Sequence, residues 1–230
     1  MSDNLEEGES LSYSPDIISL YSLSRCLDGI FWGMLFFYIT LIATFQDLVF
    51  STFPFLCCLP LMMISYASFK LPVDFLKEPA WKKNLENLRT FSLIAAFTFP
   101  FIIFMVKADK NDYFAICSIV AIYAVLRMIV SLARMSVLLG SFFGEEGLAK
   151  EGRLAVVFIY LSLITAASYI FTVISNPALI NNLLNSGSLG LIIKVGILII
   201  IVFPLLLPVT LLFRLKTLII FNTKEKLRKY

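Results

Sequence analysis

Long apolar segments alternate with short polar segments along the whole chain. Six of them approach or exceed the length of about 20 apolar residues that a helix needs to cross about 30 Å of hydrocarbon. They are residues 28–46, 49–69, 90–106, 113–139, 154–174 and 191–213. The pattern therefore predicts an all-α integral membrane protein built as a six-span helical bundle. For the first pair, which only a few residues around Asp47 separate, the alternative is a hairpin that does not fully cross.

The basic residues beside these segments predict the orientation of the bundle. With an even number of spans both ends of the chain share one side, and the side richer in Lys and Arg is cytoplasmic. Three basic residues flank the spans on one side, Lys107, Lys110 and Lys194, and fourteen flank them on the other. The fourteen are Arg25, Lys70, Lys77, Lys82, Lys83, Arg89, Lys150, Arg153, Arg214, Lys216, Lys224, Lys226, Arg228 and Lys229. Both termini are predicted to be cytoplasmic.

The domain organisation follows from the same pattern. Residues 1–13 are acidic and predicted to be disordered, residues 14–216 form a single transmembrane domain, and residues 217–230 form a basic juxtamembrane tail. Ser14-Pro15-Asp16 is typical of a helix start. It predicts either an amphipathic helix at the inner interface or an early beginning of the first span. Residues 176–184 are predicted to lie on the outer surface or to dip into the membrane as a re-entrant segment.

The hydrophilic segment 70–89 is predicted to be a second interfacial element. Pro79 is suited to the first position of a helix, whose apolar and basic side chains would then fall on opposite faces. We expect this helix to rest on lipid headgroups or, alternatively, to bind a cytoplasmic partner. The residues predicted to make this contact are Trp81, Lys82, Lys83 and Arg89.

Composition narrows the function. Hydrophobic residues make up 59% of the chain and charged residues 15%, whereas soluble domains carry about 25% charged residues. Histidine is absent, which removes the commonest general base and the commonest transition-metal ligand. The four cysteines form no C-x-x-C pair, and no hydrolase, zinc-protease or Walker motif is present. The sequence therefore predicts a non-enzymatic protein without cofactor or metal, and its basic residues indicate topology rather than nucleic-acid binding.

Charges inside the predicted spans are the candidate functional residues. Arg127 and Arg134 are seven residues apart, which places them on nearly the same helix face about 10 Å apart. An arginine at the depth of Arg127 costs about 3 to more than 10 kcal/mol unless water or a partner relieves it. Three interpretations stay open: a solute or ion path lined by Arg127 with Arg134 at its inner mouth, a structural ion pair with Asp28, or a span boundary placed wrongly.

Small residues and prolines inside the spans predict how the helices pack and bend. Gly29 and Gly33 form a G-x-x-x-G pair that allows close helix approach. An internal proline removes a backbone hydrogen bond, so the freed carbonyls could bind a cation or act as hinges, or neighbouring groups could satisfy them. The predicted kinks are at Pro60, Pro100, Pro204 and Pro208.

These observations favour a non-enzymatic component of a channel or transporter, embedded in a lipid bilayer as a homo-oligomer or with other membrane subunits. One alternative is a structural or assembly subunit of a larger membrane complex. A second is a permease subunit, because the order of segments is similar to that of six-span permeases of exporters driven by a separate ATPase. The expected location is the cell membrane of a prokaryote.

Overall fold

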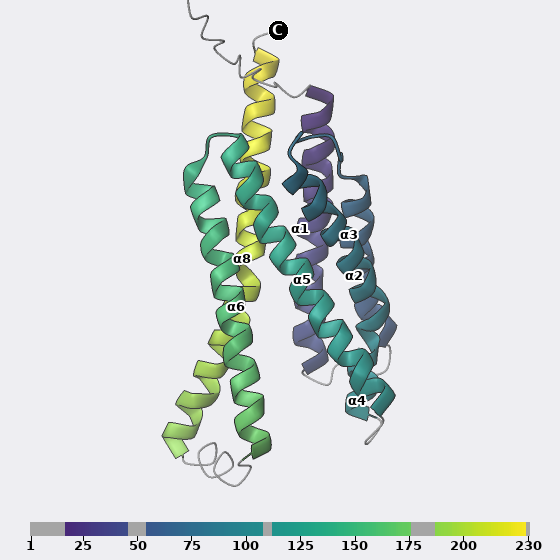
Figure 1. Ribbon diagram of the computed structural model, residues 1–230, viewed down its shortest axis with the longest axis vertical. Coiled ribbons are helices and arrows are strands. Elements are labelled where there is room, and N and C mark those ends of the chain that lie inside the picture. Colours follow the sequence, from purple (N-terminus) through teal and green to yellow (C-terminus); the bar gives the residue numbers. More distant parts are fainter. Residues whose placement is uncertain (1–16, 46–53, 108–111, 176–186, 229–230) are drawn as a thin grey trace, which may run out of the picture.

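The computed structural model describes residues 17–45, 54–107, 112–175 and 187–228, which form helices joined by short connections and contain no strand. The helices run up and down along one long axis (Figure 1). They are α1 (Ile17–Phe45), the 3₁₀ helix η2 (Pro54–Cys57), α2 (Cys58–Lys70), α3 (Pro79–Thr98), α4 (Pro100–Lys107), α5 (Asp112–Phe142), α6 (Glu146–Ser175) and α8 (Gly187–Arg228). The prediction of an all-helical fold is confirmed for this part of the chain.

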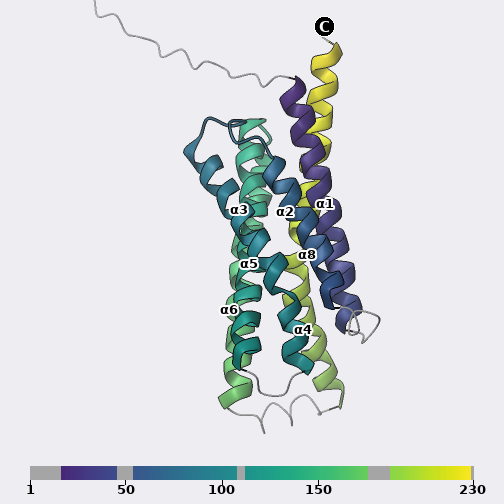
Figure 2. The same cartoon turned by 90° about the vertical axis from the view of Figure 1, so that its right-hand side faces the viewer.

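Both described ends of the chain lie at the same end of the bundle. The start of α1, the end of α8, the connection 71–78 and the turn 143–145 all gather there (Figures 1 and 2). We call it the basic end, because Lys70, Lys83, Lys150 and Arg153 belong to it. Two described stretches, Asp112–Phe142 and Leu206–Glu225, are long and apolar enough to cross a membrane by length and composition.

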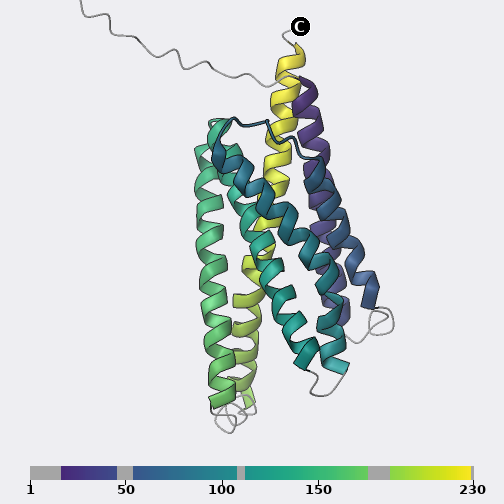
Figure 3. The ribbon, with the colours of Figure 1, turned by 45° about the vertical axis from the view of Figure 1, so that its right-hand side comes forward.

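Helix α5 is the centre of the packing. It contacts α3, α4, α6 and α8, while α1 packs against α2 and α8. Toward the end opposite the basic end, α6 and α8 lie side by side (Figures 1 and 3). The core between these helices is almost entirely aliphatic and aromatic, with a few buried serines whose hydroxyls donate to carbonyls of their own helix.

The beginning of α1 is not a separate interfacial helix. Leu20, Leu23 and Leu27 are fully buried, and the same buried stripe continues through Ile30 and Met34 of one uninterrupted helix. Of the two predictions for this segment, the structure shows the early start of the first long helix. The reason is that its leucines have core partners, so its apolar side does not need a lipid surface.

The glycine pair of α1 makes the close contact that its spacing predicted. A Cβ atom added at Gly33 would lie 2.6 Å from Ile64 Cγ1 and 3.1 Å from the Pro60 carbonyl oxygen of α2. One added at Gly29 would lie 3.1 Å from Ala67 Cβ. Helices α1 and α2 therefore approach each other at nearly backbone distance.

A second close contact joins α5 and α6. Gly144 ends α5 with a φ of +74°, and the Glu145 N–H donates to the Gly140 carbonyl over 2.8 Å. This is a Schellman end, in which glycine adopts the left-handed conformation that other residues avoid. One and a half turns into α6, a Cβ atom on Gly152 would lie 3.1 Å from the Ala133 carbonyl oxygen. Helices α5 and α6 are thus closely packed near the turn that joins them.

The prolines have different roles. Pro60 is the third residue of α2, just after the 3₁₀ helix η2 passes directly into α-helix, so its missing N–H lies close to this change of helix type. Pro100 stands at the junction of α3 and α4. Helix α8 continues through Pro204 and Pro208 and changes direction along its length (Figure 1).

Candidate functional site

Arg127 is the central residue of α5, fifteen residues from either end of the helix. At 1.5 Å per residue it lies about 22 Å from each end. Its side chain is half-buried against α3, where the guanidinium carbon lies 5.3 Å from the centroid of the Phe91 ring. Phe91 also packs edge-on against Tyr123, with 5.7 Å between the ring centroids. The Arg127 Nε is enclosed and has no hydrogen-bond partner among the described residues.

The predicted ion pair between Asp28 and Arg127 is wrong, because Asp28 has another partner. The Asp28 carboxylate accepts a hydrogen bond from the Lys216 ammonium group of α8. Within the described part of the chain, Arg127 forms no salt bridge with an acid. The order of helices explains the difference, because α1 packs against α2 and α8 whereas Arg127 faces α3.

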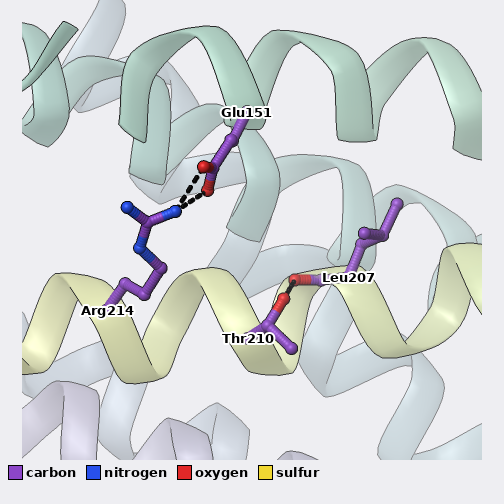
Figure 4. A network of polar contacts seen from close by, with 4 residues as sticks. All are labelled: Glu151, Leu207, Thr210 and Arg214. Atoms are coloured by element: carbon purple, nitrogen blue, oxygen red, sulfur yellow. Dashed lines mark hydrogen bonds and ion pairs between the residues drawn. The ribbon is translucent and has the colours of Figure 1, made fainter. Parts of the chain in front are cut away.

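Helix α8 carries two ion pairs at nearly the same level. Lys216 reaches Asp28 on α1, and Arg214 reaches Glu151 on α6 (Figure 4). Positions two apart on a helix point about 200° away from each other, so the two pairs hold α8 from opposite sides. We call these four residues the α8 clamp. Their side chains are 28% to 54% exposed, so each pair contributes little to stability.

Trp81 does not lie at a lipid or partner surface, contrary to the prediction. Its side chain is fully buried beside Phe75, and its Nε1 donates to the Pro72 carbonyl oxygen over 3.2 Å. Phe75 in turn contacts Phe142 and Phe143 near the turn between α5 and α6. The connection 71–78 therefore folds back over the basic end, which hydrophilicity along the sequence does not indicate.

Arg89 is also engaged within the fold rather than free to dock. Its Nε donates to the Ser68 carbonyl oxygen at 3.0 Å, and one terminal nitrogen donates to those of Phe69 at 3.0 Å and Leu71 at 2.9 Å. The last carbonyls of a helix have no partner within the helix, and a cation there is favourable. Arg89 thus closes the end of α2.

The remaining predicted docking residues, Lys82 and Lys83, have different surroundings. Lys82 is exposed, while Lys83 lines a surface cavity of about 520 Å³ between α3, α5 and α6 near the basic end. Arg134 of α5 and Arg153 of α6 line the same cavity, and none of its described lining residues is acidic. We call it the basic cavity. It is lined by Ala80, Lys83, Asn84, Asn87, Arg134, Val137, Leu138, Arg153, Val156 and Val157.

Asn84 connects this cavity to the interior of the α3–α5 contact. It is only 6% exposed, and its Nδ2 donates to the Ser131 carbonyl oxygen over 2.9 Å. Its Oδ1 has no hydrogen-bond partner among the described residues. A polar residue between Trp81 and Leu88 on the buried face of a helix is a signal that could have marked it in the sequence.

Sequence reasoning missed the α8 clamp. Arg214 and Lys216 were predicted only as orientation signals, and Glu151 was not singled out. Lys216 and Asp28 are 188 residues apart, so no local pattern relates them.

Comparison of the chain with models of known protein families, with curated protein sequences and with solved structures gave no match. Within residues 17–45, 54–107, 112–175 and 187–228, no group of three or more His, Cys, Asp or Glu side chains is placed to hold a metal ion.

Proposed function

We propose that the chain is a non-enzymatic, multi-pass membrane protein with both ends in the cytoplasm, acting in an oligomer as a component of a channel or transporter. The outward side chains support a membrane location. Large apolar residues on several helices are more than half exposed, among them Ile18 at 82%, Phe97 at 63%, Ile119 at 67% and Ile164 at 64%. Water solvates such a surface poorly, whereas lipid chains cover it.

Arg127 is the observation that supports transport. The helix places this cation midway along an apolar segment, and the fold offers it the face of Phe91 but no described acid. A cation–π contact contributes about 0.5–2 kcal/mol, whereas a buried arginine in a membrane costs about 3 to more than 10 kcal/mol. A negatively charged group from outside the chain would offset the part of this cost that the cation–π contact leaves. In our proposal it is an anion that passes the α3–α5 interface.

The alternative is that another membrane subunit supplies the negative group, which would make the chain an assembly subunit. A permease of an ATPase-driven exporter is the third possibility. It requires a free docking surface on residues 70–89, and Trp81 and Arg89 are both used inside the fold. This engagement favours the first two possibilities.

Purification of the full chain in mild detergent, followed by native mass determination, tests the oligomer. The protein is then reconstituted in liposomes and chloride flux is measured. Because the charge of Arg127 attracts the anion, Arg127→Gln should lower the flux roughly tenfold or more, while Arg127→Lys retains much of it. Arg228→Gln, at the exposed end of α8, is the matched control and should leave the flux unchanged.

Two outcomes would contradict the transport role. One is an absence of flux together with co-purifying chains that Arg127→Gln releases, which would establish the assembly subunit. The other is flux that Arg127→Gln and Arg228→Gln leave equally unchanged, which would remove Arg127 from the path.

A further inference from the structure

The basic cavity gathers positive charge from three separate helices. Lys83 comes from α3, Arg134 from α5 and Arg153 from α6, and all three side chains are exposed. Neighbouring like charges repel each other, and none of the described lining residues is an acid that would balance them. The cavity therefore favours an anionic ligand, and lysine with arginine is the combination that binds phosphate groups.

An apolar strip leads away from this charge along α6. Val157, Leu161 and Ile164 follow Arg153 at intervals of four, four and three residues, so all four share one helix face. The side chains of Val157, Leu161 and Ile164 are 60%, 55% and 64% exposed, respectively. A ligand that places an anionic group on Arg153 can thus lay a hydrocarbon chain over the strip.

We propose that the basic cavity binds the headgroup of an anionic glycerophospholipid, whose phosphate contacts Lys83, Arg134 and Arg153 and one of whose acyl chains covers Val157, Leu161 and Ile164. This inference rests on the membrane location given in the proposed function but not on transport through Arg127. It differs from the predicted docking by segment 70–89, because two of its three cations come from α5 and α6.

Asn84 also lines the cavity and joins its wall to α5, because its Nδ2 donates to the Ser131 carbonyl oxygen. Its Oδ1 is enclosed by protein and is not available to a ligand. The charge of the headgroup is therefore the basis of the expected selectivity. Phosphatidylglycerol is the anionic probe, and phosphatidylcholine, whose headgroup also carries a cation, is its neutral counterpart.

The test is lipid binding to the full chain in nonionic detergent, followed by native mass spectrometry. The probes are phosphatidylglycerol, phosphatidylcholine and inorganic phosphate. We expect phosphatidylglycerol to bind in preference to both others. Because the two removed cations attract the phosphate, the double variant Lys83→Gln with Arg153→Gln should weaken its binding roughly tenfold or more.

The control removes the same charge from the same two helices outside the cavity. Lys82→Gln with Lys150→Gln should leave binding within about twofold, because neither side chain lines the cavity. The pair Lys83→Arg with Arg153→Lys keeps both charges and should retain binding. Circular dichroism and gel filtration establish that each variant is folded.

Three results would overturn the inference. They are equal binding of phosphatidylcholine, equal loss in the two double variants, and binding of inorganic phosphate as tight as that of the lipid, which would assign the cavity to a free anion. A different result would contradict the membrane location itself, namely a chain that stays dispersed in water without detergent. A chain that needs detergent but shows no lipid preference would contradict this inference alone.

Discussion

The α1–α2–α3 side of the molecule and its α8 side are held together by different kinds of contact. On the first side, Gly33 brings α1 almost to the backbone of α2, and Arg89 of α3 donates three hydrogen bonds to the end of α2. Helix α8 instead packs through buried leucine side chains such as those of Leu212 and Leu215, with the partly exposed α8 clamp at the sides.

This difference bears on which part of the molecule can move. A contact at backbone distance has a single fit, because any sliding brings atoms into collision. Aliphatic side chains can change rotamer, and exposed ion pairs exchange with water at little cost in free energy. We therefore expect α1, α2 and α3 to form a rigid unit and α8 to shift against α1 and α6 if the protein changes state during transport.

The largest effect is expected for Arg89→Gln, which removes the contacts that close α2. Hydrogen bonds from a charged group contribute about 1.5–3 kcal/mol each, and carbonyls left unpaired add to the loss. Since water can reach part of this site, we expect the free energy of unfolding to fall by about 3 kcal/mol in total. Unfolding of the purified protein in detergent, followed by circular dichroism, measures it. Lys82→Gln on the same helix should change little, and an equal fall in both variants would contradict the role of Arg89.

A smaller effect is expected for Gly33→Ala. The added Cβ would lie 2.6 Å from Ile64 Cγ1 and 3.1 Å from a backbone oxygen, so α1 and α2 must separate. Overpacking of this kind lowers the free energy of unfolding by about 1–3 kcal/mol. Gly147→Ala is the matched control, because nothing lies within 4 Å of its added Cβ, and we expect no loss or a gain below about 1 kcal/mol. Equal changes in the same direction would show that α1 and α2 are not closely packed.

The smallest effect is expected within the α8 clamp. A double-mutant cycle of Lys216→Gln and Asp28→Asn should give a coupling free energy below about 1 kcal/mol, because both side chains are partly exposed. The same cycle for Arg214→Gln and Glu151→Gln should give a similar or smaller value, since these groups are more exposed. A coupling of several kcal/mol in either cycle would mean that α8 is fixed as firmly as α1 and α2.

Much of the fold could be predicted because it depends on neighbours along the chain. The described parts of the six apolar segments are mostly helical, although η2 and α2 share the second segment and α3 and α4 share the third. The four-residue spacing of Gly29 and Gly33 predicted a close contact that is present. A helix start at Pro79 was also predicted, but this helix runs on into the third predicted span as α3, and its Leu85 and Leu88 are buried in the fold rather than at a membrane interface. Such features follow from helical periodicity and from the short polar connections, which limit the helices to antiparallel neighbours.

The sequence by itself determined the helices, their buried faces and the concentration of basic residues beside the predicted spans. Only the tertiary structure decided which charges meet: Asp28 with Lys216 rather than Arg127, Arg89 with the end of α2, and Lys83 with Arg134 and Arg153 around one cavity. The physical reason is that a helix face specifies what a side chain requires, apolar cover or a partner for its charge, but not which helix supplies it. That choice depends on the order of helices around α5, which residues far apart in the chain determine together.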